Sequence, residues 1–364
     1  MRQVLIDRTS RIDAIDLWAI SPAPSAGRIL ASDCSLDSGV VSLVSPSARV
    51  VYAALTGDLA VAAAKFGASA LSGSTAMLTE AIHSLVDSAD QLLLLTGQSR
   101  ARKPPDRTHP FGYGMETYFW SFVVALFVFF LGGLVAFYQG VRHILMPQPI
   151  VSPAISLGVL VVSALFEGWS FAVGFREYKR VVRGRDIPLW SFIKASKDPS
   201  LYGTLLEDFS AVIGIAIAAL GVIASSLLHI GWADGAASIV IGLLLFGVSA
   251  VLANETRSLI AGEAVAGPIM EELHRVLAAD SRIVQIDAIA TMHLGPQAIL
   301  MALTLRFRSE LSIPALDDAI REITSTLQSV EKRVAYVYVR PGPNGGALAE
   351  VNPPNIRNIA FRAD

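Results

Sequence analysis

The amino-acid sequence predicts an α-helical membrane protein with six transmembrane helices and a small α+β domain near its C-terminal end. Of the 364 residues, 53 % are hydrophobic and only 16 % are charged, whereas a soluble domain carries about 25 % charged residues. The mean hydropathy is +0.53. Six long apolar stretches follow one another, and residues 267–340 then return to the mixed pattern of a small soluble domain.

The composition also excludes several classes of protein. The net charge is −2, so no basic surplus favours nucleic acid, and no nucleic-acid partner is expected. The single cysteine, Cys34, excludes an intramolecular disulfide and a zinc site built on a CxxC pair. Disorder of the whole chain is excluded because disorder requires low hydrophobicity.

The chain is predicted to have four segments. Residues 1–45 are a flexible N-terminal extension, residues 46–260 the transmembrane domain, residues 261–340 the α+β domain and residues 341–364 a disordered tail. No secretory signal peptide is expected in the extension, because its apolar run from Leu17 to Ile20 is short and lacks a basic flank.

The six predicted spans cover residues 49–70, 75–97, 117–142, 151–175, 203–228 and 233–253, and roughly 20 mostly apolar residues suffice to cross a bilayer. Lys65 in the first span is expected to extend its ammonium to the membrane interface. The loops after the second and fourth spans contain four and seven Lys or Arg residues, whereas the loops on the other side contain only Arg142. The positive-inside rule therefore places both basic loops and both chain termini in the cytoplasm.

The C-terminal domain is predicted to contain a helix, two strands, a second helix and a third strand. Pro268 and Pro314 suit the first turns of the two helices. The strands are predicted over residues 284–294, 298–307 and 334–339, an order typical of helices packed on a small sheet. His274 and His293 are isolated here, so we expect surface or packing histidines and no multinuclear metal sensor.

The second span carries ionisable residues inside an apolar stretch, and such residues are typical of functional sites in membranes. His83 and Asp87 are four residues apart and share one helix face, which Glu80 and Asp90 extend. The fifth span supplies Asp208. Imidazole and carboxylate together suit a divalent cation such as Zn²⁺. The alternative is a buried His–Asp hydrogen bond that only holds helices together.

Four motifs resemble those of the cation diffusion facilitators, a family of divalent metal/proton exchangers. They are His83-Ser-Leu-Val-Asp87, residues 106–114 with the run Pro110-Phe-Gly-Tyr-Gly114, Leu206-Glu207-Asp208, and Gly262-Glu263-Ala264. The resemblance extends over about residues 46–340. It implies a homodimer, a transport site built from the second and fifth spans, and a cytoplasmic ferredoxin-like domain that mediates dimerisation.

The fifth span departs from the family pattern, which has His or Asp at the position of Thr204 and Asp at the position of Asp208. Four replacements for the missing ligand are open: Glu207, Thr204, water, or Glu80 from the second span. Glu207 lies about 100° from Asp208 around a helix, so it is expected to reach the site only through its longer side chain or a distorted helix. The predicted metal ligands are His83, Asp87, Asp208, Glu207 and Glu80.

A second metal site in the loop after the second span is a further possibility that the resemblance raises. Asp106 and His109 match the loop site of some family members loosely, but Tyr113 stands where a second histidine often lies. The alternative for His109 is a cap or turn residue. Gly132, Gly133 and Gly140 of the third span are expected to serve ordinary helix packing.

The ligands predict how transport is driven. A ligand histidine must be neutral and ligand carboxylates ionised, so metal and protons compete for them. We therefore predict a secondary transporter, not an enzyme, that exports a divalent cation, most readily Zn²⁺, from the cytoplasm in exchange for protons. It needs no cofactor and lies in the plasma (inner) membrane. The alternatives are transport of Mn²⁺, Fe²⁺ or Co²⁺, and a non-transporting membrane scaffold or metal sensor. An intramembrane metalloprotease is excluded because no HExxH motif is present.

Overall fold

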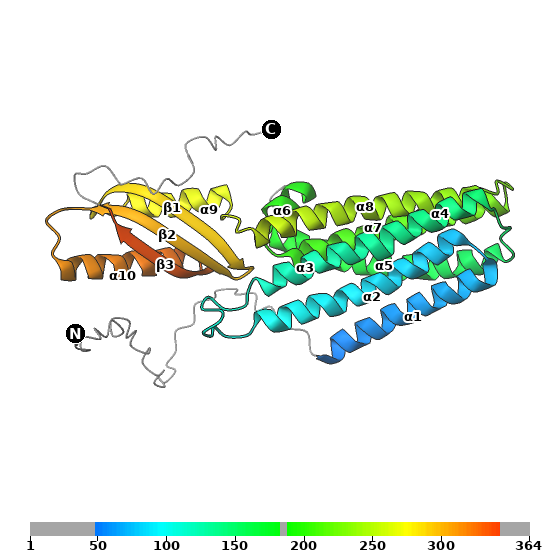
Figure 1. Cartoon of the computed structure of the whole chain (residues 1–364), viewed down its shortest axis with the longest axis horizontal. Coiled ribbons are helices and arrows are strands. Elements are labelled where there is room, and N and C mark those ends of the chain that lie inside the picture. Colours follow the sequence, from blue (N-terminus) through cyan, green and yellow to red (C-terminus); the bar gives the residue numbers. More distant parts are fainter. Residues whose placement is uncertain (1–47, 183–187, 343–364) are drawn as a thin grey trace, which may run out of the picture. The chain divides into compact units, whose positions relative to one another are not determined.

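The computed structural model describes residues 48–182 and 188–342 (Figure 1). The predicted extension, residues 1–45, and nearly all of the predicted tail, residues 341–364, lie outside the described residues. The elements are α1 (Ala48–Ser72), α2 (Thr75–Ala101), α3 (Glu116–Phe127), the π-helical segment η1 (Val128–Leu134), α4 (Val135–Leu145), α5 (Pro153–Val181), α6 (Leu189–Ala195), α7 (Pro199–Ser226), α8 (Ala233–Ile260), α9 (Gly267–Ala278), β1 (Ile283–Gly295), β2 (Ala298–Phe307), α10 (Ile313–Val330) and β3 (Val334–Pro341).

Four helical stretches among the described residues are long and apolar enough to cross a membrane: Glu116–Leu145, Pro153–Arg180, Pro199–Ser226 and Ala233–Ile260. The first of these joins α3, η1 and α4. With 25 and 27 residues, α1 and α2 are also long enough, but they do not meet the same criterion for apolar character. In α2 the reason is its run of ionisable residues, Glu80, His83, Asp87 and Asp90.

The helical stretch Glu116–Leu145, which is the third predicted span, packs against α8 at points where only glycine fits. A Cβ atom on Gly140 would lie 2.6 Å from the carbonyl oxygen of Gly235, and one on Gly133 would lie 2.6 Å from the ring of Phe246. Small residues of this kind allow membrane helices to approach closely. The prediction that these glycines serve helix packing is confirmed.

The N-terminus of α2 is fixed by a carboxylate from α8. Asp234 is fully buried and accepts hydrogen bonds from Ser74 Oγ at 2.6 Å, Thr75 N at 2.5 Å and Ala76 N at 3.2 Å. Ser74 Oγ in turn accepts a hydrogen bond from Met77 N at 3.1 Å. The first N–H groups of a helix have no partner within the helix. Here Asp234 of α8 is the hydrogen-bond acceptor for these N–H groups. It thereby positions α2, the helix that carries His83.

The C-terminal region has the predicted order of helix, strand, strand, helix and strand. The three strands lie in the order β1-β2-β3. β1 and β2 pair antiparallel, and β2 and β3 pair parallel. Leu273 and Leu277 of α9, Ile323 and Leu327 of α10, and alternate residues of β2 form its buried core. Helical spacing on the helices and alternation on β2 thus produce the apolar faces that the sequence predicted.

Candidate functional site

His83 and Asp87 lie one helical turn apart on the same face of α2. His83 Nδ1 is 3.4 Å from Asp87 Oδ1, and the histidine side chain is 1 % exposed. Within the described part of the chain, both ring nitrogens of His83 and Oδ1 of Asp87 are buried without a hydrogen-bond partner. Buried polar atoms normally have partners, and those that lack one call for a ligand, water or ion. Because both residues belong to α2, their contact does not join two helices, which argues against the alternative of a structural hydrogen bond.

Two carboxylates of α7 lie beside this pair. Asp208 Oδ2 accepts a hydrogen bond from Ser170 Oγ of α5 at 3.0 Å. Glu207 is buried, and its Oε1 atom has no hydrogen-bond partner among the described residues. The charges of both residues lie close enough to that of Asp87 to interact with it. The structure therefore brings α2 and α7 together as the sequence predicted.

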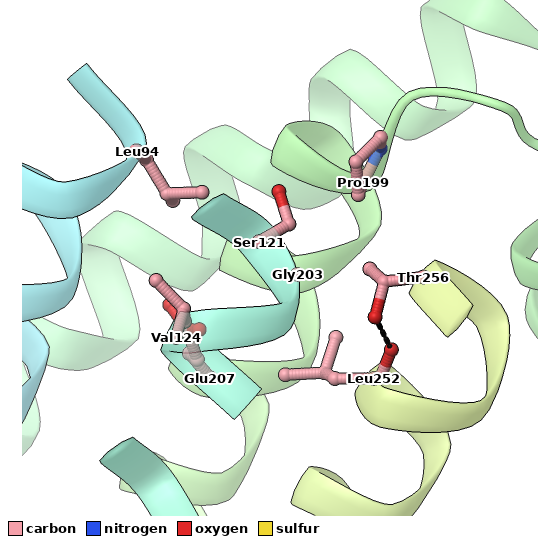
Figure 2. Close-up of a pocket in the computed structure, with 8 residues that line it drawn as sticks. All are labelled: Leu94, Ser121, Val124, Pro199, Gly203, Glu207, Leu252 and Thr256. Carbon is pink, nitrogen blue, oxygen red and sulfur yellow. Dashed lines mark hydrogen bonds between the residues drawn. The ribbon is translucent and has the colours of Figure 1, made fainter. Parts of the chain in front are cut away.

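Glu207 lines a small pocket between four helices (Figure 2). The pocket is lined by Leu94 of α2, Ser121 and Val124 of α3, Pro199, Gly203 and Glu207 of α7, and Leu252 and Thr256 of α8. Because α7 is a continuous α-helix over Pro199–Ser226, Glu207 is buried without a distortion of the helix. Of the two routes that the sequence left open for Glu207, its longer side chain is the one that agrees with the structure, and its role as a ligand stays a prediction.

Thr204 takes no part in this arrangement. It is exposed, and its hydroxyl donates a hydrogen bond to the carbonyl oxygen of Ser200 in the preceding turn at 2.9 Å. Of the open replacements for the family's ligand, Thr204 is therefore the least suited. Asp90 is a residue that the predicted ligand set left out. It is fully buried, both of its carboxylate oxygens lack hydrogen-bond partners among the described residues, and its charge interacts with those of Glu207 and Asp87.

Glu80 lies on the His83 face, as predicted, but it faces a cation. Lys65 is completely buried and its Nζ atom lies 3.4 Å from Glu80 Oε2 and 3.8 Å from Glu167 Oε1 of α5. The prediction that Lys65 reaches the membrane interface is therefore wrong. The physical reason is that these two carboxylates offer the ammonium partners inside the bundle. Glu167 was missed, although a carboxylate in the middle of an apolar stretch is a signal that sequence alone provides.

No group of three or more His, Cys, Asp or Glu side chains in the described ranges lies close enough to hold a metal ion. The buried and half-buried carboxylates of α2 and α7 lie in one region, but no three such groups come close enough together to share one cation. Like charges in a medium of low dielectric constant repel one another. Metal binding would therefore require these side chains to turn toward each other around the cation.

The loop between α2 and α3 is held by Asp106. Its carboxylate accepts hydrogen bonds from Thr108 N, His109 N and Tyr113 Oη at 2.8, 2.7 and 2.7 Å. These bonds, that from Tyr113 foremost, lower the pKa of Asp106 below its ordinary value. His109 stacks at a tilt on Tyr113, with ring centroids 4.1 Å apart. These contacts favour the turn role that the sequence left open for His109, and the loop metal site stays a prediction.

The two C-terminal histidines are a surface and a packing residue, as predicted. His274 is exposed, whereas His293 is 1 % exposed. Burial foremost, together with the positive charges of Arg333 and Lys197, lowers the pKa of His293 to about 4. The imidazole of His293 is therefore neutral at physiological pH.

The bundle of long apolar helices buries an imidazole and several carboxylates. These features place the protein among the membrane proteins that carry a site of ionisable residues between their helices. The pattern of the cation efflux transmembrane domain matches residues 51–261. The chain belongs to the cation diffusion facilitator, or cation efflux, family.

Several curated proteins are similar to this chain. The proton-coupled zinc antiporter SLC30A9, mitochondrial, of Homo sapiens is 31 % identical over 265 residues, which are 71 % of this chain and 47 % of that protein. Metal tolerance protein C4 of Arabidopsis thaliana is 30 % identical over 269 residues, 73 % of this chain and 58 % of that protein. The manganese efflux system protein MneP of Bacillus subtilis is 23 % identical over 297 residues, 82 % of this chain and 96 % of that protein. The chain thus spans about half the length of the first two relatives.

Proposed function

We propose that this protein is a secondary transporter that exports a divalent cation, with Zn²⁺ as its preferred substrate, from the cytoplasm in exchange for protons. The observation that carries the proposal is the pair of buried His83 and half-buried Asp87 beside the carboxylates of α7, with nitrogen and oxygen atoms that have no hydrogen-bond partner among the described residues. Membership of the cation efflux family supports transport. The human relative is named a proton-coupled zinc antiporter, which supports both the substrate and the coupling to protons.

The proposed ligands are His83, Asp87, Asp208 and Glu207. His83 supplies the single imidazole, a ligand that Zn²⁺ accepts readily. A metal ligand must be deprotonated, so cation binding releases protons from these residues and protonation releases the cation. Alternating exposure of the site to the two sides of the membrane would couple the two flows. Neither the cation nor the protons require a cofactor.

The proposal includes the architecture that a transporter of this kind needs. We infer that α1 and α2 cross the membrane together with the four more apolar stretches, because α2 buries Glu80, His83 and Asp90 inside the bundle. Ionisable residues in spanning helices face the bundle interior in this way. Both termini would be cytoplasmic, and residues 261–340 would form a ferredoxin-like domain that joins two copies into a homodimer. We propose the plasma (inner) membrane as its location. The alternative is an organelle, since the human relative is named mitochondrial.

A second candidate substrate is Mn²⁺. Carboxylate oxygens outnumber nitrogen ligands around His83, because Asp87, Asp90, Glu207 and Asp208 all lie in this region. Oxygen-rich sites suit Mn²⁺ better than nitrogen- or sulfur-rich ones do. A similar protein from Bacillus subtilis is named a manganese efflux protein.

Transport by purified protein in liposomes tests the proposal. Vesicles would contain a zinc-sensitive dye and an internal pH lower than the external pH, and Zn²⁺ would be added outside. We expect zinc entry that stops when the pH gradient is collapsed, and Asp87→Asn should abolish it. Asp317→Asn is the matched control, because it is the same substitution at an exposed position of α10, where Asp317 forms an ion pair with Arg321.

Competition by Mn²⁺, Fe²⁺ and Co²⁺ in the same assay identifies the preferred cation. Zinc entry that ignores the pH gradient would refute proton exchange. Absence of any cation flux, in protein that is folded and inserted, would refute transport and favour the scaffold or sensor.

A further inference from the structure

Lys65 is a fully buried cation at the meeting point of three helices. Its Nζ atom donates a hydrogen bond to Ser84 Oγ of α2 at 2.6 Å and lies 3.4 Å from Glu80 Oε2 and 3.8 Å from Glu167 Oε1. The side chains of Lys65 and Glu80 are both 0 % exposed. A buried ammonium is costly unless it is paired and hydrogen-bonded. The three partners meet both conditions.

The ion pair restricts what Glu80 can do. One carboxylate oxygen faces Lys65, and the other, Oε1, lies against α7 at Gly214, where a Cβ atom would come within 2.5 Å of it. Glu80 is thus held between Lys65 and the backbone of α7. His83 follows it by less than one helical turn, so Glu80 would be within reach of a cation on His83 if Lys65 released it.

We propose that Lys65 is a specificity-determining, positioning residue of the metal site. Its ammonium pairs with Glu80 and thereby keeps this carboxylate from coordinating the metal ion. It also neutralises part of the buried negative charge, which a second metal ion would otherwise have to do. The metal is left to His83, Asp87 and the α7 carboxylates. This inference rests on the proposed function, since it assigns Lys65 a role in the same site.

The charge balance explains the expected effect of removing the ammonium. Lys65→Met keeps an unbranched side chain that is one atom shorter, but it leaves Glu80 and Glu167 without their cation, and an unpaired buried charge is strongly destabilising. An added divalent cation would then be drawn to Glu80 as an additional ligand. We expect Lys65→Met to bind Zn²⁺ about tenfold more tightly or more, which corresponds to at least about 1.4 kcal/mol, and to release it more slowly.

Two measurements on the purified full chain test the inference. The first is calorimetric titration with Zn²⁺ of the wild type, Lys65→Met, Glu80→Gln and the double variant. We expect the double variant to lose the gain in affinity of Lys65→Met. Glu80→Gln alone should weaken binding by less than about threefold, whereas Asp87→Asn should weaken it more than about a hundredfold.

The second measurement is thermal unfolding of the same variants in chelator, and it does not depend on metal binding. We expect Lys65→Met to melt at a lower temperature than the wild type, and the double variant to recover part of the loss. Failure of the wild type to bind Zn²⁺ would refute the proposed function. The melting temperatures of the wild type, the two single variants and the double variant would still measure how much the Lys65–Glu80 ion pair stabilises the fold.

Two results would overturn the role of Lys65. The first is Glu80→Gln weakening zinc binding as much as Asp87→Asn, which would make Glu80 a metal ligand. The second is Lys65→Met folding with the zinc affinity of the wild type. If Lys65→Met does not fold, Lys65→Arg and Glu80→Gln decide the question, because Lys65→Arg keeps the charge and should keep the wild-type affinity.

Discussion

Asp234→Ala should destabilise the helical bundle more than the loss of an ordinary helix cap does. Asp234 is fully buried on α8 and accepts hydrogen bonds from Ser74 Oγ, Thr75 N and Ala76 N at the start of α2. A hydrogen bond to a charged group contributes about 1.5–3 kcal/mol, and each buried donor left without a partner adds a penalty. Because the three bonds share one acceptor, we expect a total loss of about 3–5 kcal/mol rather than their full sum.

Denaturant unfolding of the purified protein in detergent measures the effect. Asp198→Ala is the matched control, because Asp198 is also a carboxylate at a helix N-terminus, but it precedes the helix that it caps, α7, and accepts a hydrogen bond there from Ser200 N at 3.1 Å. Its loss should cost about 1 kcal/mol, as for an ordinary cap. Asp234→Asn keeps one acceptor oxygen and should lie between the two.

Equal losses for Asp234→Ala and Asp198→Ala would refute the reasoning, because they would show that the link between α8 and α2 adds nothing to an ordinary cap. A transport measurement adds a second readout. Since Asp234 fixes the start of the helix that carries His83, Asp234→Asn should reduce the rate of zinc flux while His83 and Asp87 remain in place.

Three further predictions concern zinc flux, thermal stability and the pH dependence of stability. Glu207→Gln should impair zinc flux nearly as much as Asp208→Asn, because Glu207 faces the interior, whereas Thr204→Ala should leave flux unchanged in the same liposome assay, since its hydroxyl bonds only within α7. Gly114→Val should lower the melting temperature, because a Cβ atom at Gly114 would overlap the main chain of β1. The lowered pKa of His293, about 4 against an ordinary 6.5, means that the unfolded chain takes up a proton first as the pH falls. Stability should therefore drop between about pH 6.5 and pH 4, and His293→Phe should flatten that part of the unfolding profile.

Local patterns were sufficient for the elements of the C-terminal region. The strands predicted over 284–294 and 298–307 are observed as Ile283–Gly295 and Ala298–Phe307, because alternation of apolar residues marks a face that must be buried. Each helix also begins where a proline is tolerated, one residue before Pro268 or Pro314. These features depend on neighbours along the chain, which a sequence displays directly.

The orientation of α7 was harder to predict because it depends on the other helices. The family pattern pointed to Thr204 and Asp208 as the inner face, but Thr204 is exposed and Glu207 is buried. A signal was present in the sequence: Gly203, Ser210 and Gly214 recur at helical spacing with Glu207, and all are buried. Small residues at this spacing mark the face of a membrane helix that packs on its neighbours.

The surroundings of Lys65 show the same dependence on distant residues. A lysine near a span end usually extends to the interface, and only partners inside the bundle change that outcome. Glu80 and Glu167 are those partners, on α2 and α5. Nothing local to residue 65 reveals that these helices meet there.

The balance of buried charge separates a transporter from a scaffold of the same fold. Several carboxylates interact through their charges in this part of the bundle, and the ammonium of Lys65 interacts with some of them. The carboxylates are Asp58, Glu80, Asp87, Asp90, Glu167, Glu207 and Asp208. Carboxylates in excess of cations cannot all stay ionised in an apolar interior, so this region must take up positive charge, as protons or as a metal ion. A scaffold would gain stability by replacing such groups with apolar side chains. A metal/proton exchanger requires them, because only groups that can hold either species allow one to replace the other.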